Sequence, residues 1–288
     1  MQTESRPVSS RPVHVNRGER SDGTGALIAL QAGVALVVLA ALPNPLFQLD
    51  RFTFVKELVL VAAALAATLL CIGSARKLRV FTVDLAIAGF LALSVLSALL
   101  ASNGWLATRA VGVSLAGAGL FWSARTVARA GHGRRLLAGL AASVVLGAAT
   151  GLIQAYGLIT TDLASATRAP GGTFGNRNFM AHLIAIGLPV LILVTVQAQR
   201  RRSFGLGAVG VTIVTAALVL SRSRAAWLGA AVAGTFLAVE GLWIGRLWAD
   251  QRLRSRTLTL GALALGGLLL AIVLPNRLNW RSDSPYLD

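Results

Sequence analysis

Two short segments of this chain combine residue types that bind anions. The first, at residues 170–178, reads Pro-Gly-Gly-Thr-Phe-Gly-Asn-Arg-Asn. Its glycines allow tight turns and a close approach of the backbone to a ligand. Asn176 or Asn178 could cap a following helix, and Arg177 adds a charge at its start; the alternative is an ordinary turn between two helices. The residues expected to contact an anion are Gly172, Thr173, Asn176, Arg177 and Asn178.

The second segment, at residues 220–229, reads Leu-Ser-Arg-Ser-Arg-Ala-Ala-Trp-Leu-Gly. Ser221 or Ser223 could cap the helix that follows, and Arg222 and Arg224 lie at its start. Two guanidinium groups can hold a diphosphate through paired hydrogen bonds, which lysine does poorly. The arginine pair is therefore a candidate site for a phosphate-bearing ligand.

Basic residues recur beside the starts of several expected helices. A cation in this position opposes the helix macrodipole, at a cost of a few tenths to about 1 kcal/mol when it is partly exposed. A bound anion would offset that cost, and the alternative is that the side chains extend to the phosphate headgroups of a bilayer. The repetition favours the anion. The residues concerned are Arg51, Lys56, Arg109, Arg177, Arg222 and Arg224.

The sequence offers few other candidates for catalytic or ligand-binding residues. His182 lies one helical turn after Asn178, where it could assist a site together with Lys56 or be a structural histidine that is hydrogen-bonded to another helix. No metal-ligand cluster or nucleophile–base arrangement stands out, and the single cysteine, Cys71, excludes an intramolecular disulfide framework. We therefore expect no metal and no cofactor, and we assign no general base.

The composition indicates that membrane-spanning helices position these residues. The chain is 55% hydrophobic and 13% charged, with a mean hydropathy of +0.70, whereas a soluble domain is about 25% charged. The net charge of +16 would favour nucleic acid as the partner of a soluble protein. Here the positive charge is dispersed among short gaps between apolar runs, so we expect no nucleic-acid partner.

Apolar runs of this length cross a hydrocarbon core of about 30 Å as helices, because backbone groups in lipid must be paired within the segment. We expect an all-α, polytopic transmembrane helical bundle over residues 26–274. Residues 1–25 are expected to form a disordered basic tail in the cytoplasm, and residues 275–288 to begin a periplasmic loop. The nine expected spans lie near residues 26–42, 55–73, 83–101, 106–124, 136–158, 179–198, 204–220, 225–245 and 257–274.

The distribution of basic residues predicts the orientation of the bundle. With the N-terminus inside, 18 of the 27 Lys and Arg residues lie in inner gaps and the rest lie in outer gaps or at helix ends there. This bias agrees with the positive-inside rule. Both anion-binding segments are then expected at the outer face.

These two segments, in this order on outward-starting helices, resemble the superfamily of O-antigen ligases and O-antigen polymerases, in its N-terminal portion. Gly-Thr-Phe-Gly-Asn-Arg-Asn-Phe at residues 172–179 is close to the family pattern GTFGNPN, with Arg177 where proline is more usual. Ser-Arg-Ser-Arg-Ala-Ala-Trp-Leu-Gly at residues 221–229 is close to the pattern SRgawlG. The spacing of the spans is similar along nearly the whole chain.

The resemblance implies a metal-independent, inverting membrane glycosyltransferase in the bacterial inner membrane. The donor would be an undecaprenyl-diphosphate glycan at the periplasmic face, and the acceptor a hydroxyl of lipid A core or of another glycan, as in lipopolysaccharide biosynthesis. By the same resemblance, Arg222 and Arg224 would neutralise the leaving diphosphate, assisted by Arg109 and residues 172–178.

One departure from the family qualifies this expectation. Its members carry a large periplasmic loop with a functional histidine and arginine, followed by further spans, whereas this sequence stops at Asp288. We therefore expect a truncated sequence that lacks the general base and is inactive alone. Two other functions remain open: a membrane transporter of a small anion, similar to proteins regarded as inorganic-carbon carriers, and a non-catalytic membrane scaffold.

Overall fold

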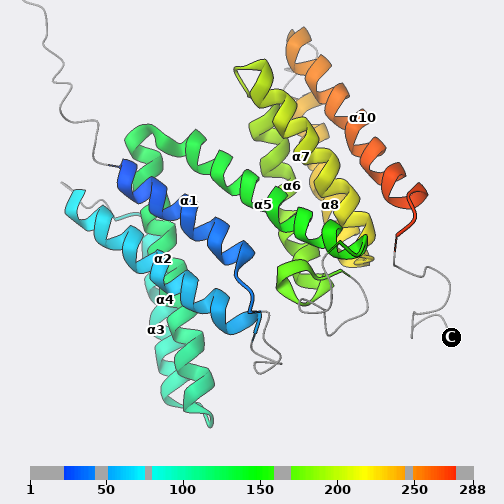
Figure 1. Ribbon diagram of the computed structural model, residues 1–288. Helices are drawn as coiled ribbons and strands as arrows, with labels where there is room; N and C mark the ends of the chain where they lie inside the picture. The colour runs from blue at the N-terminus through cyan, green and yellow to red at the C-terminus, as the bar shows by residue number, and fades with distance from the viewer. Residues whose placement is uncertain (1–22, 43–50, 75–79, 159–169, 244–248, 277–288) are drawn as a thin grey trace, which may run out of the picture.

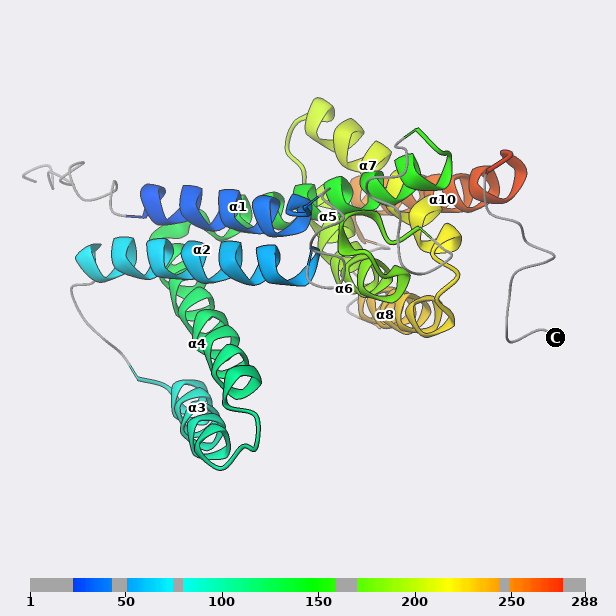
Figure 2. The same ribbon diagram turned by 60° about the horizontal axis from the view of Figure 1, so that its bottom comes forward.

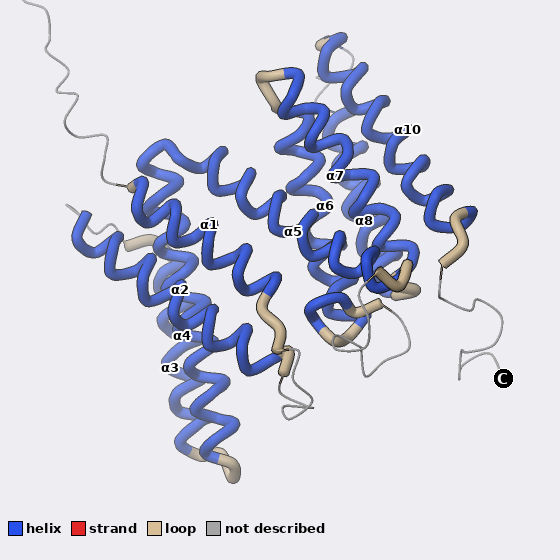
Figure 3. The backbone as a smooth tube through the Cα atoms, in the orientation of Figure 1, coloured by secondary structure: helices blue, strands red, loops and turns tan. Residues whose placement is uncertain are grey.

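Helices make up 86% of the part of the chain that the computed structural model describes, and none of that part is in a strand (Figure 3). The structure describes residues 23–42, 51–74, 80–158, 170–243 and 249–276. The all-α class expected from the sequence is confirmed. Most of the expected N-terminal tail and of the expected final loop lies outside the described residues.

Each apolar segment expected from the sequence contains a helix (Figure 1). The bounds differ from the expected ones by a few residues, as is usual for helix ends. The helices are α1 Thr24–Leu39, α2 Thr53–Ser74, α3 Thr82–Leu99, α4 Gly104–Val127, α5 Gly133–Ala155, α6 Arg177–Val196, α7 Arg201–Leu220, α8 Arg224–Trp243 and α10 Gln251–Val273.

Six helical stretches among the described residues are long and apolar enough to cross a membrane. One of them, Gly104–Ala155, contains both α4 and α5, and α1 is shorter than a typical span at 16 residues. By length and composition the protein belongs to the multi-pass membrane class, since a helix needs about 20 residues to cross the hydrocarbon core. The count of nine spans stays a prediction.

The chain reverses between α4 and α5 through a π-helical turn, Ala128–His132. Gly131 in this turn has φ 91°, in the left-handed region that glycine adopts without steric strain. The reversal allows α5 to lie beside α1 (Figure 1).

One end of the bundle brings together segments that were expected, from the sequence, at the outer face. Lys56, near the start of α2, donates a hydrogen bond of 2.7 Å to the carbonyl of Ala40, just beyond α1. Gln154, near the end of α5, accepts a hydrogen bond of 2.8 Å from the amide of Gly172, ahead of α6. The last residues of α5 and α7 share a buried cluster. We call this the motif end; it comprises the ends of α1, α5 and α7 and the starts of α2, α6 and α8.

Contacts between other helix termini define the opposite end of the bundle. The Arg134 side chain at the start of α5 donates a hydrogen bond of 2.7 Å to the carbonyl of Gln197, just beyond α6. Arg252 at the start of α10 donates one of 3.3 Å to the carbonyl of Gln199. Helices that follow one another in the chain therefore alternate in direction here, as successive membrane crossings would.

The α3–α4 hairpin is directed away from the other helices (Figure 2). No residue of α3 is buried in the protein. Asp84 fastens the start of α3 to α4 by an ion pair with Arg125 and by accepting a hydrogen bond of 2.9 Å from the indole of Trp122. The apolar surface of α3 thus has little protein cover, as expected of a helix surrounded by lipid.

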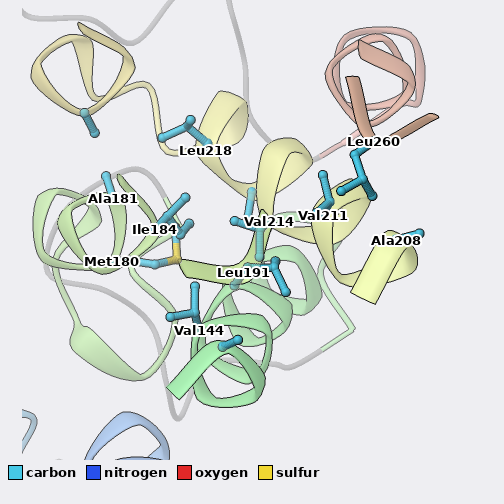
Figure 4. Close-up of a cluster of buried hydrophobic side chains, with 14 residues drawn as sticks. Val144, Met180, Ala181, Ile184, Leu191, Ala208, Val211, Val214, Leu218 and Leu260 are labelled. Carbon is cyan, nitrogen blue, oxygen red and sulfur yellow. The ribbon is translucent and has the colours of Figure 1, made fainter. Parts of the chain in front are cut away.

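The core between the two ends is apolar and closely packed (Figure 4). Glycines lie where helices approach one another: a Cβ atom on Gly187 of α6 would overlap the side chain of Val144 on α5. Small residues allow such close contact between membrane helices. The fully buried side chains of this core include Val144, Met180, Ile184, Val211 and Val214.

We expect Gly187→Ala to destabilise the bundle by about 1–3 kcal/mol, because the added methyl group overfills a closely packed contact. Gly261→Ala on α10 is the matched control, since nothing lies within 4 Å of its added Cβ. Thermal unfolding of the purified chain in detergent measures the effect. An equal midpoint for both variants would contradict the packing described for α5 and α6.

Candidate functional site

Residues 171–175 form a tight turn whose backbone requires glycine. Gly172 and Gly175 have φ values of 53° and 64°, and Gly172–Phe174 forms one turn of 3₁₀ helix. A Cβ atom on Gly171 would meet the backbone of Asn176, and one on Gly175 would meet the ring of Phe52. The close turn expected from these glycines is confirmed.

Asn176 is the residue that caps α6. Its side-chain oxygen accepts a hydrogen bond of 2.8 Å from the amide of Asn178. Arg177 is the first residue of the helix and is half-buried, whereas Asn178 is exposed. The Arg177 side chain has no hydrogen-bond or ion-pair partner in the described part of the chain.

The Thr173 hydroxyl, which was expected to contact an anion, is bonded within the protein instead. This hydroxyl donates a hydrogen bond to the carbonyl of Val38 near the end of α1, and the side chain is buried. The Thr173 amide donates a hydrogen bond of 3.4 Å to the hydroxyl of Thr150 on α5. Thr173 and Gly172 therefore fasten the turn to α1 and α5. Thr150 and Gln154 were not singled out in the sequence, although a glutamine near the end of an apolar segment is a usable signal.

Lys56 contacts the protein itself. Its ammonium group donates hydrogen bonds of 2.8, 3.2 and 2.7 Å to carbonyls at the end of α1, those of Val37, Val38 and Ala40. It also lies 4.4 Å from the centre of the Phe174 ring. A cation is favourable at a helix C-terminus, so the end of α1 offsets the unfavourable place of Lys56 at the start of α2.

Arg109 is also paired within the protein. Its Nη2 lies 2.9 Å from a carboxylate oxygen of Glu57, and its Nε donates a hydrogen bond of 3.0 Å to the same oxygen. This ion pair accounts for the charge at the start of α4 without a bound anion. The sequence did not predict it, because the two residues lie 52 positions apart.

The turn between α7 and α8 is held by Ser221. Its hydroxyl is buried, donates a hydrogen bond of 2.6 Å to the carbonyl of Leu218 and accepts one of 3.3 Å from the amide of Ser223. The indole of Trp227 donates a hydrogen bond of 2.8 Å to the same Leu218 carbonyl. Ser223 occupies the cap position of α8, since its carbonyl accepts the first helical hydrogen bond, from Trp227.

Arg222 stands at the centre of this turn with φ 52°. A residue with a Cβ atom is strained in the left-handed region, and such strain tends to occur at functional sites. The Nε and Nη2 atoms of its guanidinium group are buried. Arg224 begins α8 and is exposed, with no hydrogen-bond or ion-pair partner among the residues that the structure describes. The two arginines thus differ in environment.

His182 lies on an exposed face of α6. No other helix in the described ranges donates to it or accepts a hydrogen bond from it, so the structural interpretation of a histidine bonded to another helix does not hold there. An exposed histidine at this position could contact a ligand of the site, or it could lie on a surface that faces lipid.

The two motifs meet at the last turn of α5. Gln154 accepts a hydrogen bond from Gly172 of the first motif, and its neighbour Ala155 packs with Leu220, the first residue of the second motif. The end of α5 therefore brings together segments almost 50 positions apart in the sequence. The outer-gap residues Asp162 and Arg168 lie outside the described residues.

Within the described ranges, no group of His, Cys, Asp and Glu side chains could hold a metal ion. At the motif end, the basic side chains without a protein partner among the described residues are Arg177 and Arg224, and guanidinium groups are suited to bind oxygen atoms of an anion. Comparison of the chain with protein-family models, curated proteins and solved structures finds no match.

We expect Gly175→Ala to destabilise the protein by at least about 1–2 kcal/mol, the usual cost of a left-handed L-residue, with an added overlap at Phe52. The control is Gly89→Ala on α3, which has open space around its Cβ position. Thermal unfolding in detergent measures both variants. If Gly175→Ala unfolds no earlier than the control, the described turn is wrong.

Proposed function

We propose that the protein is a membrane glycosyltransferase similar to O-antigen ligases and polymerases, and that it binds the diphosphate of an undecaprenyl-linked glycan at the motif end. The protein would transfer the glycan to an acceptor hydroxyl, on lipid A core or on another glycan. The resemblance of the two motifs suggests the reaction, and the site contributes the physical reason for a diphosphate ligand.

The observation that carries the proposal is the joint contact of α5 with both motifs through Gln154 and Ala155. This contact places the starts of α6 and α8 at one end of the bundle. Arg177, Arg222 and Arg224 lie at or just before these helix starts. The backbone N–H groups in the first turn of a helix are also the groups that anion sites at helix starts use.

The charge balance of the motif end supports an anionic ligand. Glu57 is the only carboxylate among the described residues of this end, and Arg109 already pairs with it. Arg177 and Arg224 have no such partner in the described ranges, and the guanidinium group of Arg222 is held in a strained turn with buried nitrogens. Arginine forks match phosphate oxygens bidentately.

The chemistry that follows is a displacement at the anomeric carbon. The acceptor oxygen forms a bond to this carbon while the bond to the diphosphate oxygen breaks, and the configuration inverts. The diphosphate leaves with the electron pair, and arginines that already face it stabilise the growing negative charge. The acceptor proton goes to a general base that we do not assign to a residue of this chain.

The proposal includes a topology of nine spans with the N-terminus in the cytoplasm. The basic clusters then lie inside, in agreement with the positive-inside rule. The motif end faces the periplasm of a bacterial inner membrane, where a lipid-linked donor displays its glycan. Transport of an anion has less support, because the described core between the two ends is filled by apolar side chains.

We expect Arg222→Ala to weaken binding of undecaprenyl diphosphate by about tenfold or more, since a hydrogen bond to a charged group is worth roughly 1.5–3 kcal/mol. Arg222→Lys keeps the charge but loses the fork, and should bind with intermediate affinity. Native mass spectrometry of the chain in nanodiscs, with undecaprenyl diphosphate as the ligand, gives the affinities. The same alanine substitution should lower surface glycan when the gene is expressed in a host that lacks its own ligase.

Arg201→Ala is the matched control for Arg222→Ala, because Arg201 is an exposed arginine at the opposite end of α7. Its affinity should equal that of the unmodified chain. The proposed site is wrong if Arg222→Ala, folded by circular dichroism, retains full affinity for undecaprenyl diphosphate.

Labelling of intact cells with a membrane-impermeant thiol reagent tests the topology. In a Cys71→Ala background, we expect Ser102→Cys, at the exposed turn between α3 and α4, to react from outside. Ser203→Cys, at the exposed start of α7, should react only after the cells are opened. The reverse pattern would place the motif end in the cytoplasm and remove the periplasmic reaction.

A further inference from the structure

A cavity at the opposite end of the bundle from the motifs is lined by arginines of separate helices. It has a volume of about 370 Å³ and lies between the start of α5, the α6–α7 connection and the start of α10. This volume is within the range of roughly 300–1,000 Å³ that small-molecule sites have. The charged residues of its lining are Arg134, Arg252, Arg256 and Asp250.

The backbone beyond α6 holds these arginines in place. Arg134 and Arg252 donate hydrogen bonds of 2.7 and 3.3 Å to the carbonyls of Gln197 and Gln199. Arg256 donates bonds of 2.8 and 2.6 Å to carbonyls of the same segment and packs its guanidinium group 4.9 Å from the centre of the Phe204 ring. Three side chains from two helices are thus oriented around one space.

Capping of α6 accounts for only part of this arrangement. A helix C-terminus carries roughly half a negative charge, whereas three guanidinium groups bring three positive charges. The hydrogen bonds within the described ranges use one terminal nitrogen of each group. An arginine has five N–H donors, so most donors of the three groups are left for a ligand.

The one carboxylate of the lining does not neutralise the arginines. Asp250 accepts hydrogen bonds of 2.8 and 3.1 Å from the amides of Arg252 and Leu253 and caps α10. No ion pair joins it to an arginine of the cavity in the described ranges. The lining therefore has two positive charges in excess, and its ligand should be an anion with several acceptor oxygens.

We propose that this cavity binds the phosphate group of an anionic phospholipid headgroup. It lies where the helices end, at the depth of the headgroups if α6, α7 and α10 span the bilayer. Basic pockets between membrane helices bind such headgroups. Apolar side chains exposed on α7 and α10, such as Leu206 and Leu258, offer a surface for acyl chains. The inference does not depend on the proposed glycosyl transfer.

The test measures lipid binding to the purified full chain in detergent by native mass spectrometry. Dioleoyl phosphatidylglycerol is the probe, dioleoyl phosphatidylcholine is its zwitterionic counterpart, and inorganic phosphate is the competitor. We expect phosphatidylglycerol to bind in preference to phosphatidylcholine. Arg134→Gln and Arg252→Gln should each weaken its binding about fivefold, as expected for one basic residue near a headgroup. Both residues are exposed, and circular dichroism checks that each variant folds.

Arg202→Gln is the control, since this exposed arginine lies at the same end of the bundle outside the cavity lining. Preserved affinity in the control and a loss in the cavity variants support the site. Competition by millimolar phosphate would then indicate that free phosphate also enters, and its absence would indicate a lipid alone. Equal binding of the two lipids, or equal affinity in all three variants, would overturn the inference. The cavity variants should bind undecaprenyl diphosphate as the unmodified chain does, because the proposed diphosphate site lies at the other end of the bundle. A failure of this inference can therefore be told apart from a failure of the proposed function.

Discussion

The polar groups at helix ends constrain this fold more than any other feature. An α-helix leaves its first amides and last carbonyls without partners, and in or near lipid those groups cannot rely on bulk water. Here Lys56 binds the last carbonyls of α1, and Arg134, Arg252 and Arg256 bind those that follow α6. Most of the long-range polar contacts in the described residues serve this purpose, and they determine which helix ends lie together.

The same constraint separates two kinds of basic residue at the motif end. Lys56 and Arg109 satisfy groups of the protein, a helix terminus and the carboxylate of Glu57. Arg224, which begins α8, has no such partner among the described residues. Arg222 occupies the left-handed position of the turn between α7 and α8, which a glycine would adopt without strain.

Close packing of helices then brings the two motifs to a common place. Glycines at helix contacts, such as Gly151 against Met180, let α5 approach α6 with little space between them. Because α5 also runs parallel to α7, its last turn lies beside both the 172–178 turn and the start of the second motif.

The sequence by itself determined the helices, the glycine-dependent turn and that an asparagine caps α6, because these depend on hydropathy over about 20 residues or on neighbours within one turn. The structure decided between Asn176 and Asn178. The sequence could not determine the partners of Lys56, Arg109 and Thr173, which are decided by residues distant in the chain. Only the tertiary structure showed that the positive charges of Lys56 and Arg109 serve the protein. Helix packing decides which distant residue each of these side chains contacts, and a partner on another helix leaves no pattern in the sequence around the side chain.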